Sequence, residues 1–325
     1  MILYGPVMSW RLGRSLGVDP VQPPKICTYD CIYCQLGPTR YKIGSLDEAY
    51  RLRTFPSAEQ LRKELERKLR TCALGFINFI TFSGCGEPTL SPNLRELVLR
   101  VRDVTKGLVP VAILTNSSLI CDERVASTLA MFDLVIAKLD APSEEEFKVV
   151  NRPHEAIRYD DVVEALKEFR RRYRGVLAVE IMLLKYKGLN LIEKVDEYKE
   201  LIRYIGFDMV QANTVTRPPQ IEEVKAISKE EMNEFARVLR EELRIDVKDP
   251  YSSRPLIRGK LTLEDVENEI YEVLKRRPCS VAYLSRILGL EEKATVEVVR
   301  RLLRRGLVEE VVYRGEMVYR AISSS

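Results

Sequence analysis

The stretch KICTYDCIYCQLG, residues 25–37, places Cys27, Cys31 and Cys34 in one short segment. A disulfide framework uses cysteines in pairs, and a closed tetrahedral zinc site needs four donors. Iron–sulfur clusters are usually held by four thiolates, so a cluster held by three keeps one iron free for an outside ligand. The three thiols therefore favour an iron–sulfur cluster with an open position.

Two alternatives stay open for this stretch: a zinc site that borrows a fourth ligand, and ordinary buried thiols. Structural zinc sites normally pair close spacings such as C-x2-C. The chain has no second pair, and its one histidine is His154. Thiolate-rich sites suit iron–sulfur clusters and zinc alike, so the spacing favours the cluster over zinc and does not settle the choice.

The composition is that of a globular protein with one large and one small domain. The chain has 325 residues, of which 46% are apolar, enough to bury a full core. Its net charge of +4 permits an anionic partner such as RNA without requiring one. Seven cysteines and no signal-peptide pattern predict the reducing cytoplasm, and the longest apolar run, residues 72–82, is too short to span a membrane.

From about residue 57 to residue 245, short β-branched or aromatic runs alternate with stretches of helical period. This alternation predicts βα units around a parallel sheet, with the chemistry at the carboxyl ends of the strands. The predicted strands are residues 76–82, 109–115, 133–139, 176–184 and 207–215, and the clearest helices are residues 57–70, 159–174 and 190–205.

The last part of the chain has a different pattern. Residues 249–260 contain prolines and serines without periodicity, so we expect a linker there, between a first domain at 1–248 and a second at 261–325. The second domain should contain three helices and two alternating strands that turn at Arg314 and Gly315, which together predict a winged helix-turn-helix. The expected helices are residues 263–277, 280–289 and 292–306, and the strands lie within 307–321.

Cys27-x3-Cys31-x2-Cys34, with Tyr33 before the third cysteine, resembles the signature of the radical S-adenosylmethionine (SAM) superfamily, and the resemblance covers most of residues 1–245. It implies an α/β fold, a partial (βα)6 TIM-like barrel whose first strand lies within residues 15–26. It also implies a [4Fe-4S] cluster, SAM bound to the open iron, and an electron donor such as a flavodoxin or ferredoxin. Reductive cleavage of SAM would give a 5′-deoxyadenosyl radical that abstracts hydrogen from a substrate.

Residues 5–19, GPVMSWRLGRSLGVD, resemble most closely a branch of iron–sulfur oxidoreductases related to enzymes that build the wyosine base in tRNA. Those tRNA-modifying relatives carry further cysteines ahead of the motif. This chain has none before Cys27, which argues against the same reaction.

SGCGEPTL, residues 83–90, follows the strand predicted at 76–82. It resembles the glycine-glycine-glutamate motif that receives the SAM ammonium: Gly86, Glu87 and Pro88 match, and Cys85 stands where the first glycine is common. Small residues allow close backbone approach, and a carboxylate facing an ammonium makes a charge-assisted hydrogen bond. The alternative is a strand-to-helix turn with a solvated Glu87.

Cys85 could donate a hydrogen atom, ligate a metal, or simply be a small buried residue in place of glycine. We expect Cys72, Cys121 and Cys279 to pack as small apolar groups.

Polar residues at further strand ends complete the expected site. By the resemblance, such residues hold the SAM carboxylate, ribose and adenine, although each could instead cap a helix or form a salt bridge. The loop at Asn151, Arg152 and His154 could face a substrate or solvent. The strand-end candidates are Thr115, Asn116, Ser117, Lys138, Asp140, Glu180 and Gln211.

The predicted third helix of the small domain begins with Glu291 and Glu292, and these carboxylates would face phosphate. We therefore do not expect sequence-specific DNA binding, and expect docking to the barrel, to a protein or to a structured RNA.

Two function classes follow. One is a radical SAM enzyme acting on an RNA or protein substrate, with tRNA as a candidate. The other is an iron–sulfur redox sensor that acts through the winged helix. SGCGEP favours the enzyme, because a sensor needs no ammonium-binding carboxylate.

Overall fold

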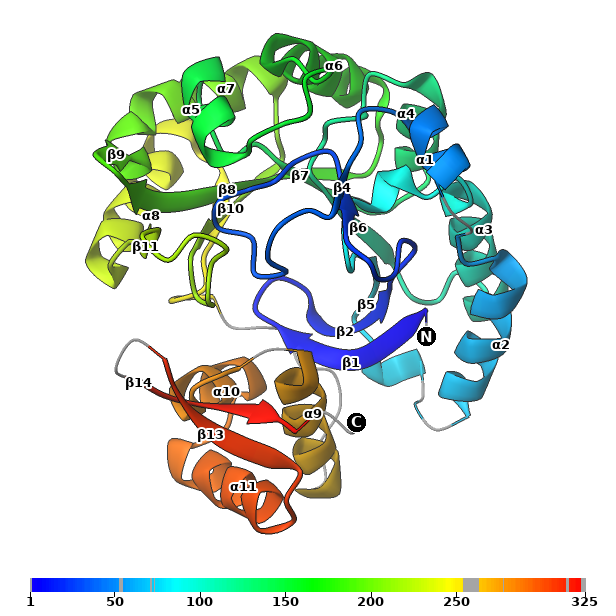
Figure 1. The fold of residues 1–325 in the computed structure, drawn as a ribbon, viewed down its shortest axis with the longest axis vertical. Helices are drawn as coiled ribbons and strands as arrows, with labels where there is room; N and C mark the ends of the chain where they lie inside the picture. The colour runs from blue at the N-terminus through cyan, green and yellow to red at the C-terminus, as the bar shows by residue number, and fades with distance from the viewer. Residues whose placement is uncertain are drawn as a thin grey trace.

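The computed structural model describes residues 2–52, 55–70, 72, 74–253, 263–276, 278–313 and 316–322. Its main sheet curls into an open barrel (Figure 1). From β2 onward the neighbouring strands along the curl are parallel, whereas β1 pairs antiparallel with β2. In spatial order the strands are β1 (Leu3–Ser9), β2 (Gly13–Val18), β5 (Phe79–Phe82), β6 (Val111–Thr115), β7 (Leu134–Lys138), β8 (Val176–Tyr186), β10 (Met209–Thr214) and β12 (Asp246–Lys248).

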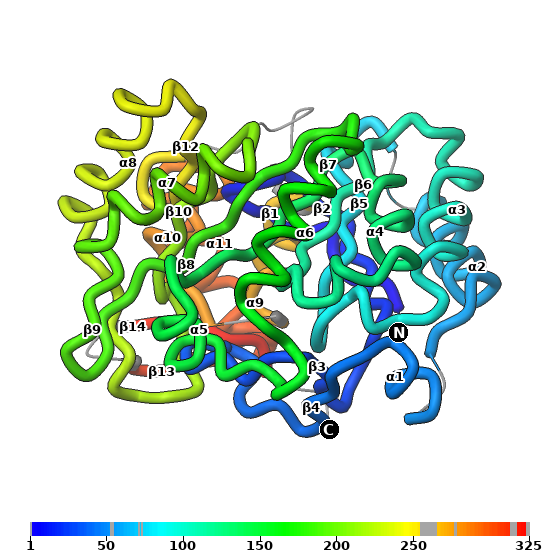
Figure 2. The backbone as a smooth tube through the Cα atoms, turned by 90° about the horizontal axis from the view of Figure 1, so that it is seen from above, coloured from blue at the N-terminus to red at the C-terminus, as the bar shows by residue number. Residues whose placement is uncertain are grey.

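Helices cover the outer face of this sheet, and Figure 2 shows α2 and α3 on one flank and α7 and α8 on the other. None of the described helices combines the length and the apolarity of a membrane span. The helices are α1 (Leu46–Leu52), α2 (Ala58–Leu69), α3 (Leu94–Thr105), α4 (Glu123–Leu129), α5 (Glu144–Val150), α6 (Tyr159–Arg172), α7 (Val195–Ile205) and α8 (Lys229–Leu243). Short strands β3 (Ile26–Cys27), β4 (Tyr41–Lys42), β9 (Leu189–Asn190) and β11 (Lys225–Ala226) lie outside the main path of the sheet.

The partial-barrel prediction is confirmed, and each predicted strand overlaps an observed one. The first strand is β2, which begins at Gly13, before the predicted range of 15–26. Two features were missed. β12 has only three residues, too few for an alternating hydrophobic pattern to be recognised in the sequence. β1 contains Gly5 and Pro6, and its pairing shifts register between Tyr4 and Val7, so the strand alternation is broken.

Three helices and a hairpin follow the barrel, in the order expected from the sequence. They are α9 (Leu263–Arg276), α10 (Val281–Leu288), α11 (Glu292–Arg304), β13 (Val308–Tyr313) and β14 (Glu316–Ala321), and we call them the C-terminal unit. The predicted turn at Arg314 and Gly315 and most of the predicted linker at 249–260 lie outside the described residues. The winged-helix assignment of this unit stays a prediction.

The C-terminal unit packs on β1, at the edge of the curled sheet (Figure 1). Met8 of β1 is 1% exposed and lies in the apolar core that Ile270, Leu284 and Val298 also form. The buried Arg14 of β2 forms an ion pair with Glu269 of α9. The unit therefore shares its core with the barrel and extends the wall of the barrel interior.

Because Met8 lies in this shared core, its substitution tests the contact between β1 and the C-terminal unit. We expect Met8→Ala to destabilise the packing of the C-terminal unit by about 2–5 kcal/mol, since the truncation leaves a cavity in a buried apolar site. Urea unfolding and limited proteolysis measure the loss, with Leu108→Ala, at a side chain that is 69% exposed, as the control. Unchanged unfolding and an unchanged cleavage pattern in Met8→Ala would show that the unit does not depend on β1.

Candidate functional site

A cavity of about 430 Å³ opens at the carboxyl ends of the barrel strands, within the usual size range of small-molecule sites. Its walls come from the cysteine segment, the turn after β5, the ends of β6 and β7, the middle of β8, and the β1–β2 hairpin. Val273 of α9 and Tyr283 of α10 close another side. The C-terminal unit is thus part of the cavity wall.

The two motifs found separately in the sequence lie against each other in this cavity. Cys27, Cys31 and Cys34 all line it. Ile26 forms a parallel bridge with Gly86, and the Glu87 amide donates to the Ile26 carbonyl at 3.0 Å. A Cβ at Gly86 would stand 1.9 Å from that carbonyl oxygen, so only glycine permits this approach.

Two thiols of the cysteine segment, those of Cys27 and Cys31, have raised pKa values that favour their neutral form. Burial, reinforced by the Glu87 carboxylate, raises the pKa of Cys27 to about 12. Burial and then the Asp140 carboxylate also hold the pKa of Cys31 above its ordinary value. A metal site would displace these thiol protons on binding.

The arrangement of the thiols bears on which metal fits. Among the residues that the structure describes, no three His, Cys, Asp or Glu side chains are arranged to hold a single metal ion. A zinc ion needs all its ligands about 2.0–2.3 Å from one centre, whereas the thiolates of a cluster bind different irons. The three thiols border one cavity, and the cluster that they are expected to hold stays a prediction.

Glu87 is 2% exposed, so the alternative of a solvated side chain is wrong. Its Oε1 accepts from the Thr89 amide at 3.1 Å, the Thr89 hydroxyl at 2.7 Å and the Thr115 hydroxyl at 2.6 Å. Its Oε2 accepts from the Asn116 amide at 2.7 Å, and among the described residues no second donor contacts this atom. Burial raises the pKa of Glu87, and its hydrogen bonds oppose that rise. The carboxylate joins the turn after β5 to the end of β6 and keeps acceptor capacity on Oε2.

Glu87→Ala should therefore lower the free energy of unfolding by about 2–5 kcal/mol, because it leaves the Thr89 and Asn116 amides buried without their acceptor. Glu87→Gln keeps a carbonyl for part of the set and should lose less. Denaturant unfolding of the metal-free protein compares the two. Equal stability of Glu87→Ala and the wild type would contradict the role of this carboxylate.

Lys138, Glu180 and Arg11 form a charged group in the lining of the cavity, with Glu180 buried and the two cations half-buried. Lys138 Nζ lies 2.9 Å from Glu180 Oε1 and 3.3 Å from Asp140 Oδ1, and Arg11 Nη2 lies 2.9 Å from Glu180 Oε2. Burial would raise the pKa of Glu180, but Arg11 and Lys138 prevail and hold it at about 2. Burial would lower the pKa of Lys138, but Asp140 and Glu180 together hold it above its ordinary value. Glu180 and Lys138 are therefore both charged at neutral pH.

Asp140 connects this charged group to the cysteine segment. It accepts hydrogen bonds from the Tyr33 hydroxyl and, at 2.7 Å, from the Asn151 amide. Lys138 Nζ lies 5.2 Å from the centre of the Tyr33 ring, within cation–π range. Tyr33 thus links the loop that carries the thiols to the end of β7.

Most of the predicted site residues meet at the cavity. Pro88 lies outside the lining and begins a short buried 3-10 helix, Asp140 lies behind Lys138, and Cys85 lines the cavity with its amide donating to Asp19 at 3.1 Å. The expectation for Cys121 is wrong: it is exposed, because it lies in the surface turn after β6. The predicted residues that line the cavity are Cys27, Cys31, Tyr33, Cys34, Cys85, Gly86, Glu87, Thr115, Asn116, Lys138 and Glu180.

Sequence reasoning missed Trp10, Arg11, Arg217 and Tyr283, which also line the cavity. Trp10 and Arg11 lie in the turn between β1 and β2, a hairpin that the sequence did not reveal. Tyr283 comes from the C-terminal unit, whose contact with the barrel no local pattern indicates. A spatial arrangement, rather than a motif, identifies these residues.

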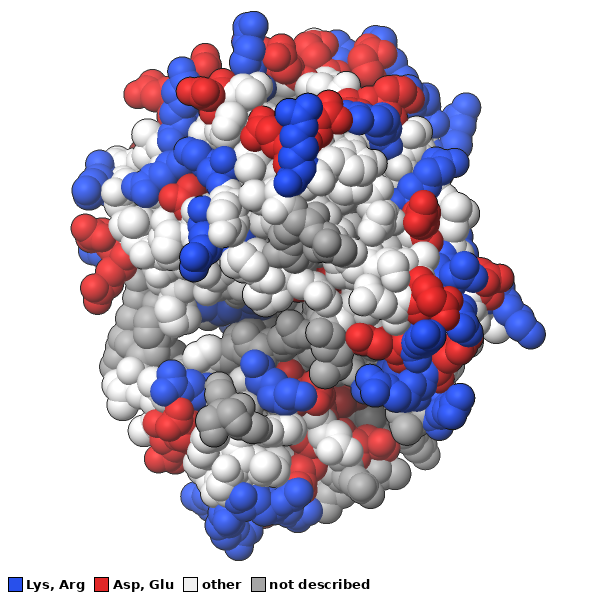
Figure 3. Space-filling model, turned by 45° about the vertical axis from the view of Figure 1, so that its right-hand side comes forward, with Lys and Arg blue, Asp and Glu red and all other residues white. Residues whose placement is uncertain are grey.

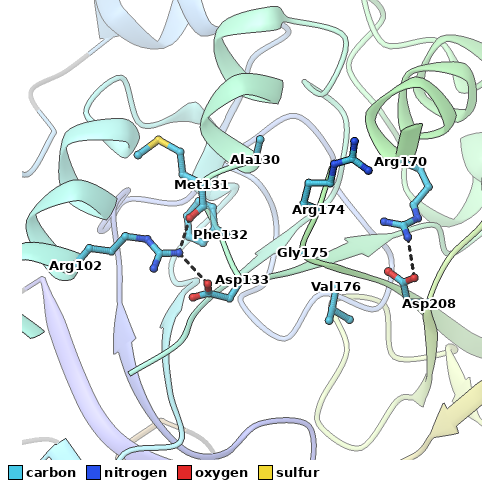
Figure 4. Close-up of a pocket in the computed structure, with 10 residues that line it drawn as sticks. All are labelled: Arg102, Ala130, Met131, Phe132, Asp133, Arg170, Arg174, Gly175, Val176 and Asp208. Carbon is cyan, nitrogen blue, oxygen red and sulfur yellow. Dashed lines mark hydrogen bonds and ion pairs between the residues drawn. The ribbon is translucent and has the colours of Figure 1, made fainter. Parts of the chain in front are cut away.

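A second depression lies at the opposite, amino-terminal ends of β7, β8 and β10 (Figure 4). In it Arg102 points to Asp133 and Arg170 points to Asp208, with ion-pair distances of 3.0 and 2.9 Å. The active sites of such barrels lie at the carboxyl ends of the strands. These ion pairs fix the beginnings of the strands.

Comparison with known proteins agrees with this geometry. Residues 21–202 match the model of the radical SAM superfamily. A UPF0026 protein of Methanocaldococcus jannaschii is 31% identical, over 98% of this chain and 95% of its own length. A Brachyspira hyodysenteriae protein named GTPase Obg is 34% identical over 98% of this chain, and this chain spans only 45% of that protein.

Among solved structures, a radical SAM methyltransferase from Sphaerobacter thermophilus superposes with a TM-score of 0.55. The match covers 72% of this chain and 65% of that one, at 16% sequence identity. At this identity the likeness concerns the fold alone, and the shared fold is the partial barrel.

Proposed function

The chain belongs to the radical SAM superfamily, whose members use a [4Fe-4S] cluster and SAM, and from this premise we propose that it is an enzyme with Cys27, Cys31 and Cys34 as cluster ligands. One observation carries the proposal: the three thiols and the turn at Gly86 and Glu87 border the same cavity and touch through Ile26. When bound, the cluster would supply the electron that cleaves SAM to methionine and a 5′-deoxyadenosyl radical.

The charges around the cavity support an assignment of its residues to SAM. Glu87 Oε2 and the backbone at Gly86 would receive the ammonium, with Cys85 and Pro88 shaping that turn. Lys138 would attract the carboxylate, because it ends β7 and its side chain lines the cavity. Glu180 would accept from the ribose hydroxyls, Asp140 would hold Lys138 and Tyr33 in place from behind, and Thr115, Asn116 and Tyr33 would border the cofactor.

The remaining walls would exclude water from the reacting atoms. Trp10, Met182 and Val273 add apolar surface to the cavity, and Tyr283 closes it from the C-terminal unit. A radical that can abstract hydrogen from unactivated carbon must be shielded from other donors. The C-terminal unit would thus take part in the reaction as a wall of the site.

For the substrate we propose an RNA, with tRNA as the first to test, in line with the resemblance of residues 5–19 to the wyosine-related branch. Half-buried Arg217 lines the cavity. Figure 3 shows a basic patch at the lower end of the molecule, where α11 carries the exposed Arg300 and Arg304. Such groups suit a phosphate backbone. A flavodoxin or ferredoxin in the cytoplasm would supply the electron.

The experiment is anaerobic reconstitution with iron and sulfide, reduction, and addition of SAM with unmodified tRNA, followed by chromatography of 5′-deoxyadenosine and of digested tRNA nucleosides. We expect 5′-deoxyadenosine that depends on the reconstituted cluster, and a new nucleoside. A cluster that forms but yields no 5′-deoxyadenosine with any reductant would favour the redox-sensor alternative. 5′-Deoxyadenosine without a new nucleoside would reject tRNA and keep the enzyme.

A further inference from the structure

Each of the three motif thiols receives an N–H donor from a different residue. Lys25 Nζ lies 3.2 Å from Cys34 Sγ. Asn116 Nδ2 lies 3.5 Å from Cys27 Sγ, and Asn151 Nδ2 lies 3.5 Å from Cys31 Sγ. The donors come from the start of the cysteine segment, the end of β6 and the end of α5, segments that only the fold brings together.

The Asn116 amide is locked with its NH2 group toward the thiol. Its Oδ1 accepts the Ser118 amide at 3.0 Å, and its Nδ2 also donates to the Thr28 hydroxyl at 2.7 Å. A flipped amide would place its NH2 group against the Ser118 N–H, so that two donors would face each other. Because both ends of the side chain are committed, its donation to Cys27 is part of a fixed network.

Asn151 is also held in one orientation. Its Nδ2 donates at 2.7 Å to Asp140 Oδ2, and the residue is 2% exposed. A flipped amide would place an oxygen against the Asp140 carboxylate. The Asp140 carboxylate therefore selects the orientation that also directs an N–H at Cys31.

Lys25 supplies the one charged donor of the three. Its ammonium is anchored by the Gly37 carbonyl at 2.6 Å, just beyond the cysteine segment, and points a second N–H at Cys34. A cation beside a ligand sulfur stabilises added negative charge more than a neutral amide does.

We propose that Lys25, Asn116 and Asn151 are positioning residues that raise the reduction potential of the cluster held by Cys27, Cys31 and Cys34. This inference rests on the cluster of the proposed function. Hydrogen bonds to the sulfurs are among the factors that set such potentials. They favour the reduced cluster because it carries one more negative charge. The step concerned is the transfer of one electron from the flavodoxin or ferredoxin, with no bond made or broken in the protein.

Redox titration of the reconstituted protein tests the proposal, with the reduced cluster followed by electron paramagnetic resonance (EPR). Lys25→Met should lower the equilibrium constant for reduction by about tenfold, a shift of 59 mV toward negative potential for one electron. Asn151→Leu should give a smaller shift in the same direction, and Lys25→Arg should restore most of the potential because it keeps the charge. Lys63→Met and Asn190→Leu, outside the cavity lining, are the matched controls and should leave the potential unchanged.

A second readout needs no variant. In protein with 15N-labelled lysine and asparagine side chains, pulsed EPR of the reduced cluster should show nitrogen couplings from both residue types. A bound cluster with no such couplings, or equal potentials in Lys25→Met, Asn151→Leu and the controls, would overturn the proposal while leaving the cluster assignment intact. Failure of the wild type to bind iron and sulfide would instead refute the proposed function on which it rests.

Discussion

Cys31→Ala protein, reconstituted with iron and sulfide, should retain only background cluster and form no 5′-deoxyadenosine above background. Mutating a residue that hydrogen-bonds a metal ligand typically lowers metal affinity or activity by about 10–100-fold. Mutating a ligand itself should therefore lower them by more than about 100-fold. The barrel should stay folded, because removing one sulfur costs only about 1 kcal/mol, the typical loss for a point mutation. Iron and sulfide analysis with EPR measures the cluster, chromatography measures 5′-deoxyadenosine, and circular dichroism measures the fold.

The matched control is Cys121→Ala, because Cys121 is exposed and is absent from the cavity lining. It should bind a full cluster and cleave SAM at the wild-type rate. A full complement of iron and sulfide in Cys31→Ala would reject Cys31 as a ligand. Retention of zinc by the wild type, with no cluster, would return the motif to the zinc alternative.

Gly86→Ala should have the second large effect, on both the cluster and SAM. The added Cβ would stand 1.9 Å from the Ile26 carbonyl oxygen, a backbone atom that no side-chain rotation can move. The cysteine segment or the turn after β5 must therefore shift, and overpacking of this kind costs about 1–3 kcal/mol. We expect SAM affinity to fall by at least about tenfold, which corresponds to 1.4 kcal/mol, and cluster content to fall with it.

Gly75→Ala is the control, because a Cβ there would meet nothing within 4 Å. It should bind SAM like the wild type by equilibrium dialysis or calorimetry. If Gly86→Ala also bound the cluster and SAM normally, the contact between the two motifs would not matter for the site. A stable Gly86→Ala protein that bound the cluster but not SAM would confine the role of this turn to SAM.

The parts of the site that the sequence predicted are those that lie on contiguous motifs. The spacing of Cys27, Cys31 and Cys34 and the residues Gly86 and Glu87 are local patterns, and the βα rhythm places them at the same end of the sheet. Thr115 and Lys138 were found because they end buried strands. Local pattern and fold agree at these positions.

The rest depends on contacts between distant segments. Arg11 reaches Glu180 from a hairpin whose alternation is broken at Gly5 and Pro6. Asn151 reaches Cys31 from the end of α5. Tyr283 reaches the cavity only because the C-terminal unit shares a core with β1. None of these pairings follows from the spacing of residues along the chain.

The position of the C-terminal unit bears on the second function class, a redox sensor that acts through this unit. A redox sensor would need a unit free to carry a signal to DNA. Here Met8 and Arg14 join that unit to the barrel, and Val273 and Tyr283 line the cavity. This arrangement supports the unit as part of an enzyme site.

The most direct measurement is the EPR spectrum of the reduced cluster before and after addition of SAM labelled with 15N in its amino group and 17O in its carboxylate. The account predicts a shift of the spectrum and hyperfine coupling to both labels, because the iron without a cysteine ligand would bind both groups. Loss of the cluster signal in Cys31→Ala would tie this binding to the three thiols. A reduced cluster whose spectrum stays unchanged when SAM is added would contradict the account.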